Sequence, residues 1–209
     1  MAVSKSIQNY FKSQKLVKVA KNTVLSDKRE FAKGVFMIKK GAVKIFNNTG
    51  KNDFILWIGL DGDLIGVDAA FSKEKSNNSY LCIQNSELYF VPFQEFIDEL
   101  NKNKNLLAEI MHYLSGKSDE LEKRILNINR KSVTANFAEL LLSFNHKNVP
   151  NLIPFVITTG DVANLIGTTK NYIYKTIQRM EDKGIISFKD RKLQIINKEL
   201  LRQLVQTEN

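Results

Sequence analysis

The sequence has few of the residues that form covalent or metal-bound scaffolds. Its 209 residues include one cysteine, Cys82, two histidines, His112 and His146, and three prolines. A single cysteine excludes a disulfide framework and a Cys-rich zinc or iron–sulfur site within one chain. The longest apolar runs, such as residues 54–60, are much shorter than the roughly 20 residues of a bilayer-spanning helix. The sequence therefore lacks the marks of a disulfide-rich secreted protein and of an integral membrane protein.

The amino-terminal segment carries five lysines within its first 21 residues but no apolar stretch typical of a signal peptide. The whole chain is 43% hydrophobic and 25% charged, which is too apolar for a disordered chain and too charged for a membrane protein. Its length suits one large domain or two small ones. We therefore expect a soluble protein that stays in the cytoplasm and does not associate with a membrane.

The charge is unevenly distributed along the chain. The net charge is +9, yet residues 1–51 hold 12 Lys and Arg against two acids, whereas residues 157–209 hold nine against six. A basic chain favours contact with polyanions such as nucleic acids. Because most of the excess lies in the amino-terminal quarter, net charge does not locate a nucleic-acid site. A basic, solvated surface explains that quarter equally well.

Short β-type runs separated by turn signals fill residues 16–92. The runs are 35–38, 42–46, 54–60, 80–83 and 88–91, and Asn47-Asn48-Thr49-Gly50 is a hairpin signal. Regularly spaced short strands of this kind predict an antiparallel sandwich or barrel. Helices are expected before it, over residues 4–11, and after it, over residues 93–100.

A heptad pattern follows. Between residues 107 and 128, one stripe recurs at alternating spacings of four and three: Leu107, Met111, Leu114, Ser118, Leu121, Ile125 and Ile128. Such a narrow stripe, flanked by charged residues that include Lys117 and Arg124, favours pairing with an identical helix. The alternative is an amphipathic helix docked on its own domain. Ser118 can set the register of the pair or face a bound ligand.

Residues 157–187 carry the most informative motif. Thr158 and Asp161 have the spacing of a capping box, which predicts the start of a helix. Gly167 can take the positive φ of a tight turn, and Thr168 or Thr169 can cap a second helix, which Gly184 ends. The buried face of this second helix is expected to be Ile173, Ile177 and Met180. This is the pattern of a helix-turn-helix that offers its second helix to a DNA major groove.

A strand–turn–strand over residues 185–196, with a basic tip, adds the wing of a winged helix, and Asn197 is expected to cap a last helix. Lysine can bind guanine and asparagine can bind adenine, while hydroxyls at helix starts meet phosphates. The candidate DNA-binding residues are Thr158, Thr159, Thr168, Thr169, Lys170, Asn171, Tyr172, Lys175 and Arg191. The alternatives are a helix-turn-helix used only for protein contact, two ordinary packed helices, and a plain solvated face.

Taken together, these segments resemble the Crp/Fnr family of bacterial transcription regulators. The resemblance runs from about Val35 to Ile196 and includes the stretches 35–44, 62–66 and 167–187. It implies an α+β protein with an antiparallel, jelly-roll type β-roll similar to a cyclic-nucleotide-binding domain, a dimerisation helix and a winged helix-turn-helix. It further implies a homodimer on a near-palindromic site in double-stranded DNA, with RNA polymerase as a partner. The expected domains are residues 1–104, an effector-type β-roll, 105–131, the dimerisation helix and hinge, and 132–209, the DNA-binding domain.

Several positions depart from the family pattern. Cyclic-AMP binders carry Glu at the position of Val67 and an Arg-Ser or Arg-Thr pair at Asn77-Asn78, so cyclic AMP is not the expected ligand. The amino-terminal Cys cluster of iron–sulfur members is missing, no histidine lies in the expected roll to bind haem, and Cys82 is expected to be a small buried hydrophobe. The weak effector-pocket candidates are Gly66, Val67, Asp68, Asn77, Asn78, Ser79 and Ser118. Lys170-Asn171 and Lys175 replace the usual Arg-Glu and a later Arg, which predicts a different operator.

Three functions follow from these patterns. The first is a sequence-specific DNA-binding transcription regulator without enzymatic activity. The second is a small-molecule or partner-binding module that lacks a specific operator. The third, a cupin-type enzyme, needs His and carboxylate ligands on strands, and no predicted strand contains a histidine.

Overall fold

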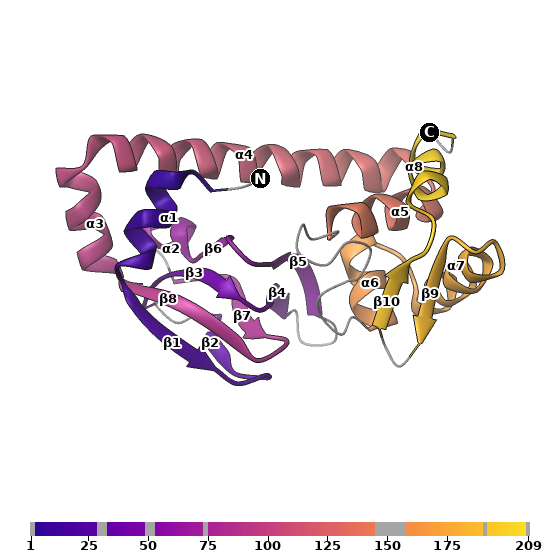
Figure 1. The fold of residues 1–209 in the computed structure, drawn as a ribbon, viewed down its shortest axis with the longest axis horizontal. Coiled ribbons are helices and arrows are strands. Elements are labelled where there is room, and N and C mark those ends of the chain that lie inside the picture. Colours follow the sequence, from indigo (N-terminus) through magenta and orange to yellow (C-terminus); the bar gives the residue numbers. More distant parts are fainter. Residues whose placement is uncertain are drawn as a thin grey trace. The chain divides into compact units, whose positions relative to one another are not determined.

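The computed structural model describes residues 3–28, 33–48, 53–72, 75–144, 158–189 and 192–207. The chain divides into two compact units, Met1–Leu121 and Glu122–Asn209, and Figure 1 shows the course of the chain through them. The first is an antiparallel β domain with helices and the second is a helix-turn-helix domain. The predicted α+β class with a long helix between sheet and helix-turn-helix is confirmed.

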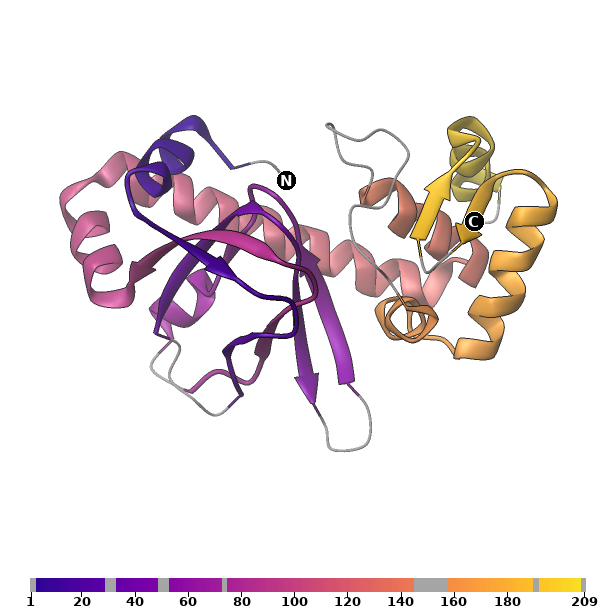
Figure 2. The ribbon, with the colours of Figure 1, turned by 60° about the horizontal axis from the view of Figure 1, so that its bottom comes forward.

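The first unit contains two four-stranded antiparallel sheets. One sheet has the order β1 (Lys15–Val19), β8 (Ser86–Pro92), β3 (Gly34–Lys40) and β6 (Leu64–Ile65). The other has the order β2 (Val24–Ser26), β7 (Ser79–Cys82), β4 (Val43–Asn48) and β5 (Asp53–Gly59). Figure 2 shows these strands wrapped around one another as a roll. The predicted strands correspond to β3, β4, β5, β7 and β8.

One core lies between the two sheets. It joins Ile38, Ile65 and Leu88 of one sheet to Val43 and Cys82 of the other. Cys82 is fully buried there, and burial raises the pKa of its thiol. The side chain therefore packs as a small apolar group, as the sequence predicts.

A second core covers the other face of the sheet that contains β3. Helices α1 (Lys5–Lys12), α2 (Val67–Phe71), α3 (Phe93–Lys102) and the first half of α4 (Lys104–Arg130) pack there. In both ribbon views α1 and α3 lie beside that half of α4 (Figures 1 and 2). Within the described residues, no helix combines the length and the apolarity that a membrane span requires.

The first half of helix α4 docks on the first unit through a stripe of side chains beside the predicted heptad. Leu106, Ile110 and Tyr113 are buried, and the Tyr113 hydroxyl accepts a hydrogen bond from the Leu64 amide at 3.0 Å. Lys117 continues the stripe. Its ammonium lies 3.2 Å from Asp63 Oδ1 and 4.5 Å from the centre of the Trp57 ring. The charged flank of the predicted heptad is therefore partly a docking surface.

The heptad stripe itself remains largely open in the single chain. Met111 is 63% exposed, Ile125 is 62% exposed and Leu121 is 40% exposed. Leu107 and Leu114 are partly buried against the second core of the first unit. The two interpretations of this helix are thus compatible, because docking takes up only part of the heptad stripe and leaves Met111, Leu121 and Ile125 exposed.

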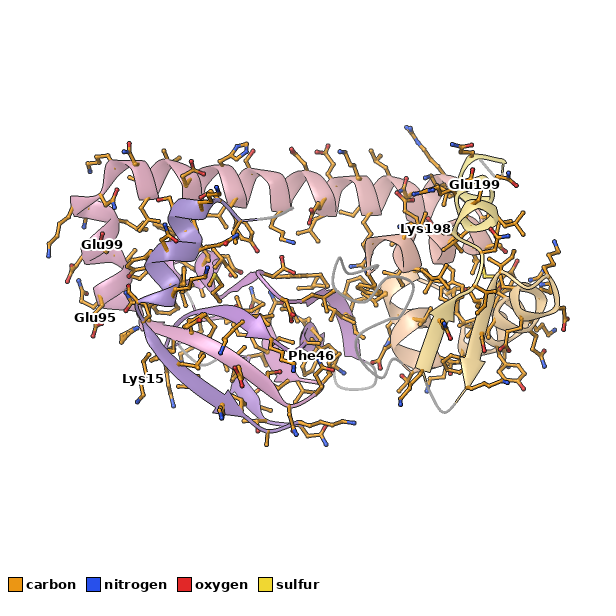
Figure 3. All side chains as sticks on the ribbon, viewed as in Figure 1. Lys15, Phe46, Glu95, Glu99, Lys198 and Glu199 are labelled. Carbon is orange, nitrogen blue, oxygen red and sulfur yellow. The ribbon has the colours of Figure 1, made fainter. Side chains whose placement is uncertain are left out.

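Two buried tyrosines, Tyr80 and Tyr113, and the half-buried Tyr10 predict a loss of stability in alkali. Burial raises the pKa of Tyr10 and Tyr80 to about 12 and raises that of Tyr113 further. Glu95 and Glu99, one turn apart on α3 (Figure 3), add to the rise at Tyr10. The unfolded chain releases these protons near pH 10, so stability is intact below that pH and falls as the pH rises toward about 12. Urea unfolding across this range, followed by tyrosinate absorbance, measures the effect.

The control for this measurement uses an exposed tyrosine. Tyr80→Phe should flatten the alkaline decline, whereas Tyr174→Phe, at a side chain that is 57% exposed, should leave it unchanged. An equal effect of both substitutions would contradict the assignment of the decline to buried phenols.

The second unit is built from helices around one hairpin. Its elements are α5 (Val133–Ser143), α6 (Thr159–Ile166), α7 (Lys170–Asp182), β9 (Ile186–Lys189), β10 (Lys192–Ile195) and α8 (Lys198–Thr207). Ser132 caps α5, and Asn197 Oδ1 accepts the Leu200 amide at the start of α8 at 3.0 Å, as predicted. Residues 145–157, which include Pro150 and Pro154, lie outside the described residues.

Candidate nucleic-acid interface

The first helix of the predicted motif, α6, begins at the capping box. Thr158 Oγ1 accepts the Asp161 amide at 3.0 Å, and Asp161 Oδ2 accepts the Thr158 amide at 3.4 Å. Val162, Ala163, Leu165 and Ile166 are buried. The reciprocal cap leaves the first turn of α6 at the surface while its apolar face holds the helix in the domain.

The corner between the two helices requires glycine. Gly167 has φ 70° and ψ 40°, and its amide and that of Thr168 both donate to the Ala163 carbonyl. A Cβ atom at this position would lie 3.2 Å from Cγ2 of Ile128 on α4. The positive φ therefore disfavours any residue with a side chain, and a Cβ here would also press on Ile128.

The second helix, α7, is fixed by its cap and by its buried face. Thr169 Oγ1 accepts the Tyr172 amide at 3.3 Å, so Thr169 is the cap and Thr168 is not. Ile173, Ile177 and Met180 are buried, as predicted. The helix ends before Gly184, which has φ 64°. These contacts confirm the predicted helix-turn-helix.

The remaining face of α7 is open to solvent. Lys170, Asn171, Tyr172 and Lys175 are all exposed, and Tyr172 is 44% exposed. At the helix starts, Thr158 and Thr169 are exposed, whereas Thr159 and Thr168 are half-buried. The side chains of the predicted set that lie on α7 are thus directed away from the domain core.

Lys170 connects the start of α7 to the start of α6. Its Cε lies 2.7 Å from the position that a Cβ on Gly160 would occupy, so the side chain crosses the first turn of α6. The two helix starts and one cation therefore lie close together. Two helix starts and an ammonium at one place suit a phosphate group.

Arg179 belongs to the same face but was not predicted. Its Nε donates to the Lys175 carbonyl at 3.3 Å, and its guanidinium carbon lies 5.9 Å from the centre of the Tyr172 ring. Residues 172, 175 and 179 form one stripe at helical spacing. This spacing was the signal that could have identified Arg179 from the sequence.

The predicted wing is the hairpin of β9 and β10. Ile186 pairs with Ile195 and Phe188 with Leu193, and Glu181 of α7 accepts the Phe188 amide at 2.6 Å. Lys189 and Lys192 are exposed where the hairpin approaches its tip. Arg191, the predicted tip residue, lies outside the described residues.

The effector candidates are spread over several elements of the first unit. Gly66, with φ 82°, precedes α2, where Val67 is buried and Asp68 is exposed. Ser79 is buried and donates to Asp27 Oδ1 at 2.7 Å. Asn77 and Ser118 are exposed and Asn78 is half-buried. Within the described ranges, no group of three or more His, Cys, Asp or Glu residues is placed to hold a metal ion.

Two buried hydroxyls near these candidates were missed. Ser26 and Tyr80 are cross-strand partners in β2 and β7, and in the described part of the chain the buried Ser26 hydroxyl has no hydrogen-bond partner. Tyr80 also lies 3.8 Å from the position of a Cβ on Gly66. The residues next to Ser26 and Tyr80 in the sequence do not indicate that these two side chains become cross-strand partners.

Comparison with known proteins accounts for both units. The family model of a cyclic nucleotide-binding domain matches residues 16–103, and that of a Crp-like helix-turn-helix domain matches residues 137–204. The chain belongs to the Crp/Fnr family. It is therefore a Crp/Fnr-type transcription regulator with a DNA-binding helix-turn-helix.

Relatives of this Crp/Fnr regulator include the fumarate and nitrate reduction regulatory protein of Yersinia pestis. The two are 27% identical over 178 residues, which cover 82% of this chain and 71% of the relative. The protein of the same name from Escherichia coli is 25% identical over 178 residues, with the same shares covered. These relatives are regulators by name rather than enzymes.

Solved structures share the fold. FixK2 from Bradyrhizobium japonicum has a TM-score of 0.81 and 18% identity, covering 91% of this chain and 96% of that one. A transcriptional regulator of the Crp/Fnr family from Thermus thermophilus has a TM-score of 0.75 and 17% identity, covering 93% of this chain and 100% of that one.

Proposed function

We propose that this Crp/Fnr regulator acts as a homodimer that binds a near-palindromic DNA sequence, with each α7 in a major groove. The observation that carries the proposal is the two-sided character of α7. Ile173, Ile177 and Met180 anchor one side, and the other side presents Lys170, Asn171 and Lys175 to solvent. A helix held in this way can enter a groove without unfolding its own domain.

The open heptad stripe of α4 supports the homodimer. Met111 and Ile125 occupy equivalent heptad positions and are 63% and 62% exposed. A second copy of the same stripe would bury both of them. The two α7 helices must then match half-sites about one DNA turn, roughly 34 Å, apart.

The chemistry of the exposed face assigns different tasks to different residues. Asn171 can bind adenine through two hydrogen bonds, and Lys170 or Lys175 can donate to guanine. Thr158, Thr159, Thr168 and Thr169 lie at the helix starts, where they can contact phosphates. We also infer a phosphate contact for Arg191.

The experiment that tests this function is the selection of bound sequences from random DNA, followed by titration of variants. Asn171→Ala should relax the preference at one base pair, with a loss of about 1–3 kcal/mol on the preferred sequence only. Thr159→Ala should weaken binding to all sequences alike. Fluorescence anisotropy on matched duplexes measures both effects, and affinity should fall steeply with salt.

Equal affinity of the unmodified protein for every duplex would contradict the proposal. Ligand-induced thermal stabilisation without any preferred DNA sequence would favour a small-molecule or partner-binding module instead. A uniform loss for Asn171→Ala would place Asn171 on a phosphate rather than on a base.

We further propose that the roll does not respond to cyclic AMP. Val67 replaces the expected glutamate, and Asn77-Asn78 replace the expected Arg-Ser or Arg-Thr pair, so the ribose and the phosphate would lack their usual partners. The buried Ser26 hydroxyl, which has no partner in the described part of the chain, suits a different polar effector. We infer RNA polymerase as a partner from the family resemblance.

A further inference from the structure

Arg124 contacts the backbone of the helix-turn-helix directly. Its Nε donates to the carbonyl of Leu165 at 2.9 Å, and Nη2 donates to the same oxygen. The guanidinium is half-buried, and this burial lowers its pKa. The Arg124 guanidinium is thus partly removed from water and bound to the main chain of α6.

The accepting carbonyl lies at the end of α6. The last four carbonyls of a helix have no partner within the helix. In α6 the Ala163 carbonyl receives the Gly167 and Thr168 amides, while Arg124 supplies the donor for Leu165. A cation at the carboxyl end of a helix also interacts favourably with the helix dipole. Arg124 therefore caps α6 from another helix.

Ile128, one turn further along α4, contacts the same corner. Its Cγ2 would lie 3.2 Å from a Cβ on Gly167. The predicted heptad assigned Ile128 to the dimer stripe, whereas the structure packs it against the turn of the helix-turn-helix. Ile125, between Arg124 and Ile128, remains 62% exposed. The last turns of α4 thus contact the α6–α7 corner through Arg124 and Ile128, and they expose Ile125 of the heptad stripe to solvent.

We propose that Arg124 is a positioning residue for DNA recognition. With Ile128 it joins the α6–α7 corner to α4, so that pairing of α4 fixes the direction of α7 through this joint. The inference rests on the proposed function. Because Nε and Nη2 are directed at the Leu165 carbonyl, we expect this side chain to contact neither bases nor phosphates.

The test compares a full palindromic site with an isolated half-site. Arg124→Lys keeps the charge but loses the two-pronged geometry, and Arg124→Met keeps only the alkyl chain. Both should weaken full-site binding about tenfold or more, as the loss of a charged hydrogen bond predicts. Half-site affinity should change less than about twofold, the preference for one half-site spacing should broaden, and the salt slope should stay constant.

Arg202→Met is the matched control, because Arg202 is an exposed arginine of the same unit that pairs with Glu199 at 3.2 Å. It should leave both affinities and the spacing preference unchanged. Equal losses on full and half sites, or a salt slope reduced by about one, would make Arg124 a DNA contact and overturn the proposal. Unchanged full-site affinity would also overturn it.

A measurement without DNA separates this inference from the proposed function. Amide hydrogen exchange at residues 166–169 should accelerate in Arg124→Lys and not in Arg202→Met. If the unmodified protein shows no preferred DNA sequence, the proposed function fails, and the exchange rates still decide whether the joint exists. Should Arg124→Met unfold, Arg124→Lys and Ile128→Val provide the same comparison.

Discussion

Gly167→Val is expected to abolish specific DNA binding and to destabilise the second unit more than any other single substitution at this surface. A β-branched residue at φ 70° is strained by about 1–3 kcal/mol. Its side chain also meets Ile128, and such overpacking costs about 1–3 kcal/mol more. Because the corner sets the crossing of α6 and α7, relief of this strain misdirects the recognition helix. Urea unfolding and titration on the selected duplex measure the two consequences.

Gly184 provides the matched control for this substitution. It has φ 64°, but nothing lies within 4 Å of a Cβ built on it. Gly184→Val therefore carries the backbone strain without the contact to Ile128 and should retain more stability than Gly167→Val. Equal losses in the two variants would show that the packing of Ile128 on the corner contributes nothing. Adding Ile128→Ala to Gly167→Val should restore part of the stability.

Ile125→Glu is expected to separate the proposed dimer and to reduce affinity for a full palindromic site by about 10²–10⁴-fold. The side chain is 62% exposed in the single chain, so the substitution does not disturb the fold. In the pair, two carboxylates would face each other in an apolar seam, where like charges are unfavourable. Analytical ultracentrifugation and titration on full and half sites measure the effect.

Leu126→Glu is the matched control for this prediction. Leu126 is 43% exposed and follows Ile125 directly, but it lies off the heptad stripe. This variant should remain dimeric and keep its affinity for the full site. Dissociation of Leu126→Glu to the same extent, or a dimeric Ile125→Glu, would contradict pairing through residues 107–125.

The helix-turn-helix was predictable because its signals are local. A threonine and an aspartate three residues apart form the cap, and a glycine provides the positive φ of the turn. Each of these features depends on a few consecutive residues. The apolar spacing of α7 likewise follows from helical periodicity, so its exposed polar face could be inferred before the fold was known.

The roles of the charged residues on α4 were not predictable in this way. Lys117 and Arg124 look like solvated flanks of a heptad, yet one contacts Asp63 and the other the Leu165 carbonyl. Both partners are distant in sequence. Nothing in the residues around a lysine or an arginine indicates which distant acceptor the fold will bring to it.

The short strands β1, β2 and β6 show the same limit. β6 has only two residues and β1 reads Lys-Leu-Val-Lys-Val, so neither has the periodicity of an isolated strand. They are strands because β8, β7 and β3 supply the hydrogen-bond partners of β1, β2 and β6, respectively. Pairing with neighbours, rather than propensity, decides their conformation.

The amino-acid sequence by itself determined the succession of a β-rich segment, a long helix and a helix-turn-helix, together with the corner at Gly167 and the polar face of α7, since caps, turns and amphipathic periods arise within a few residues. Only the tertiary structure decided that α4 docks through Tyr113 and Lys117, that Ile128 and Arg124 hold the corner, and that Ser26 lies opposite Tyr80 across β2 and β7. Those contacts join segments far apart in the chain, and they exist only once the apolar faces of sheet and helices have packed.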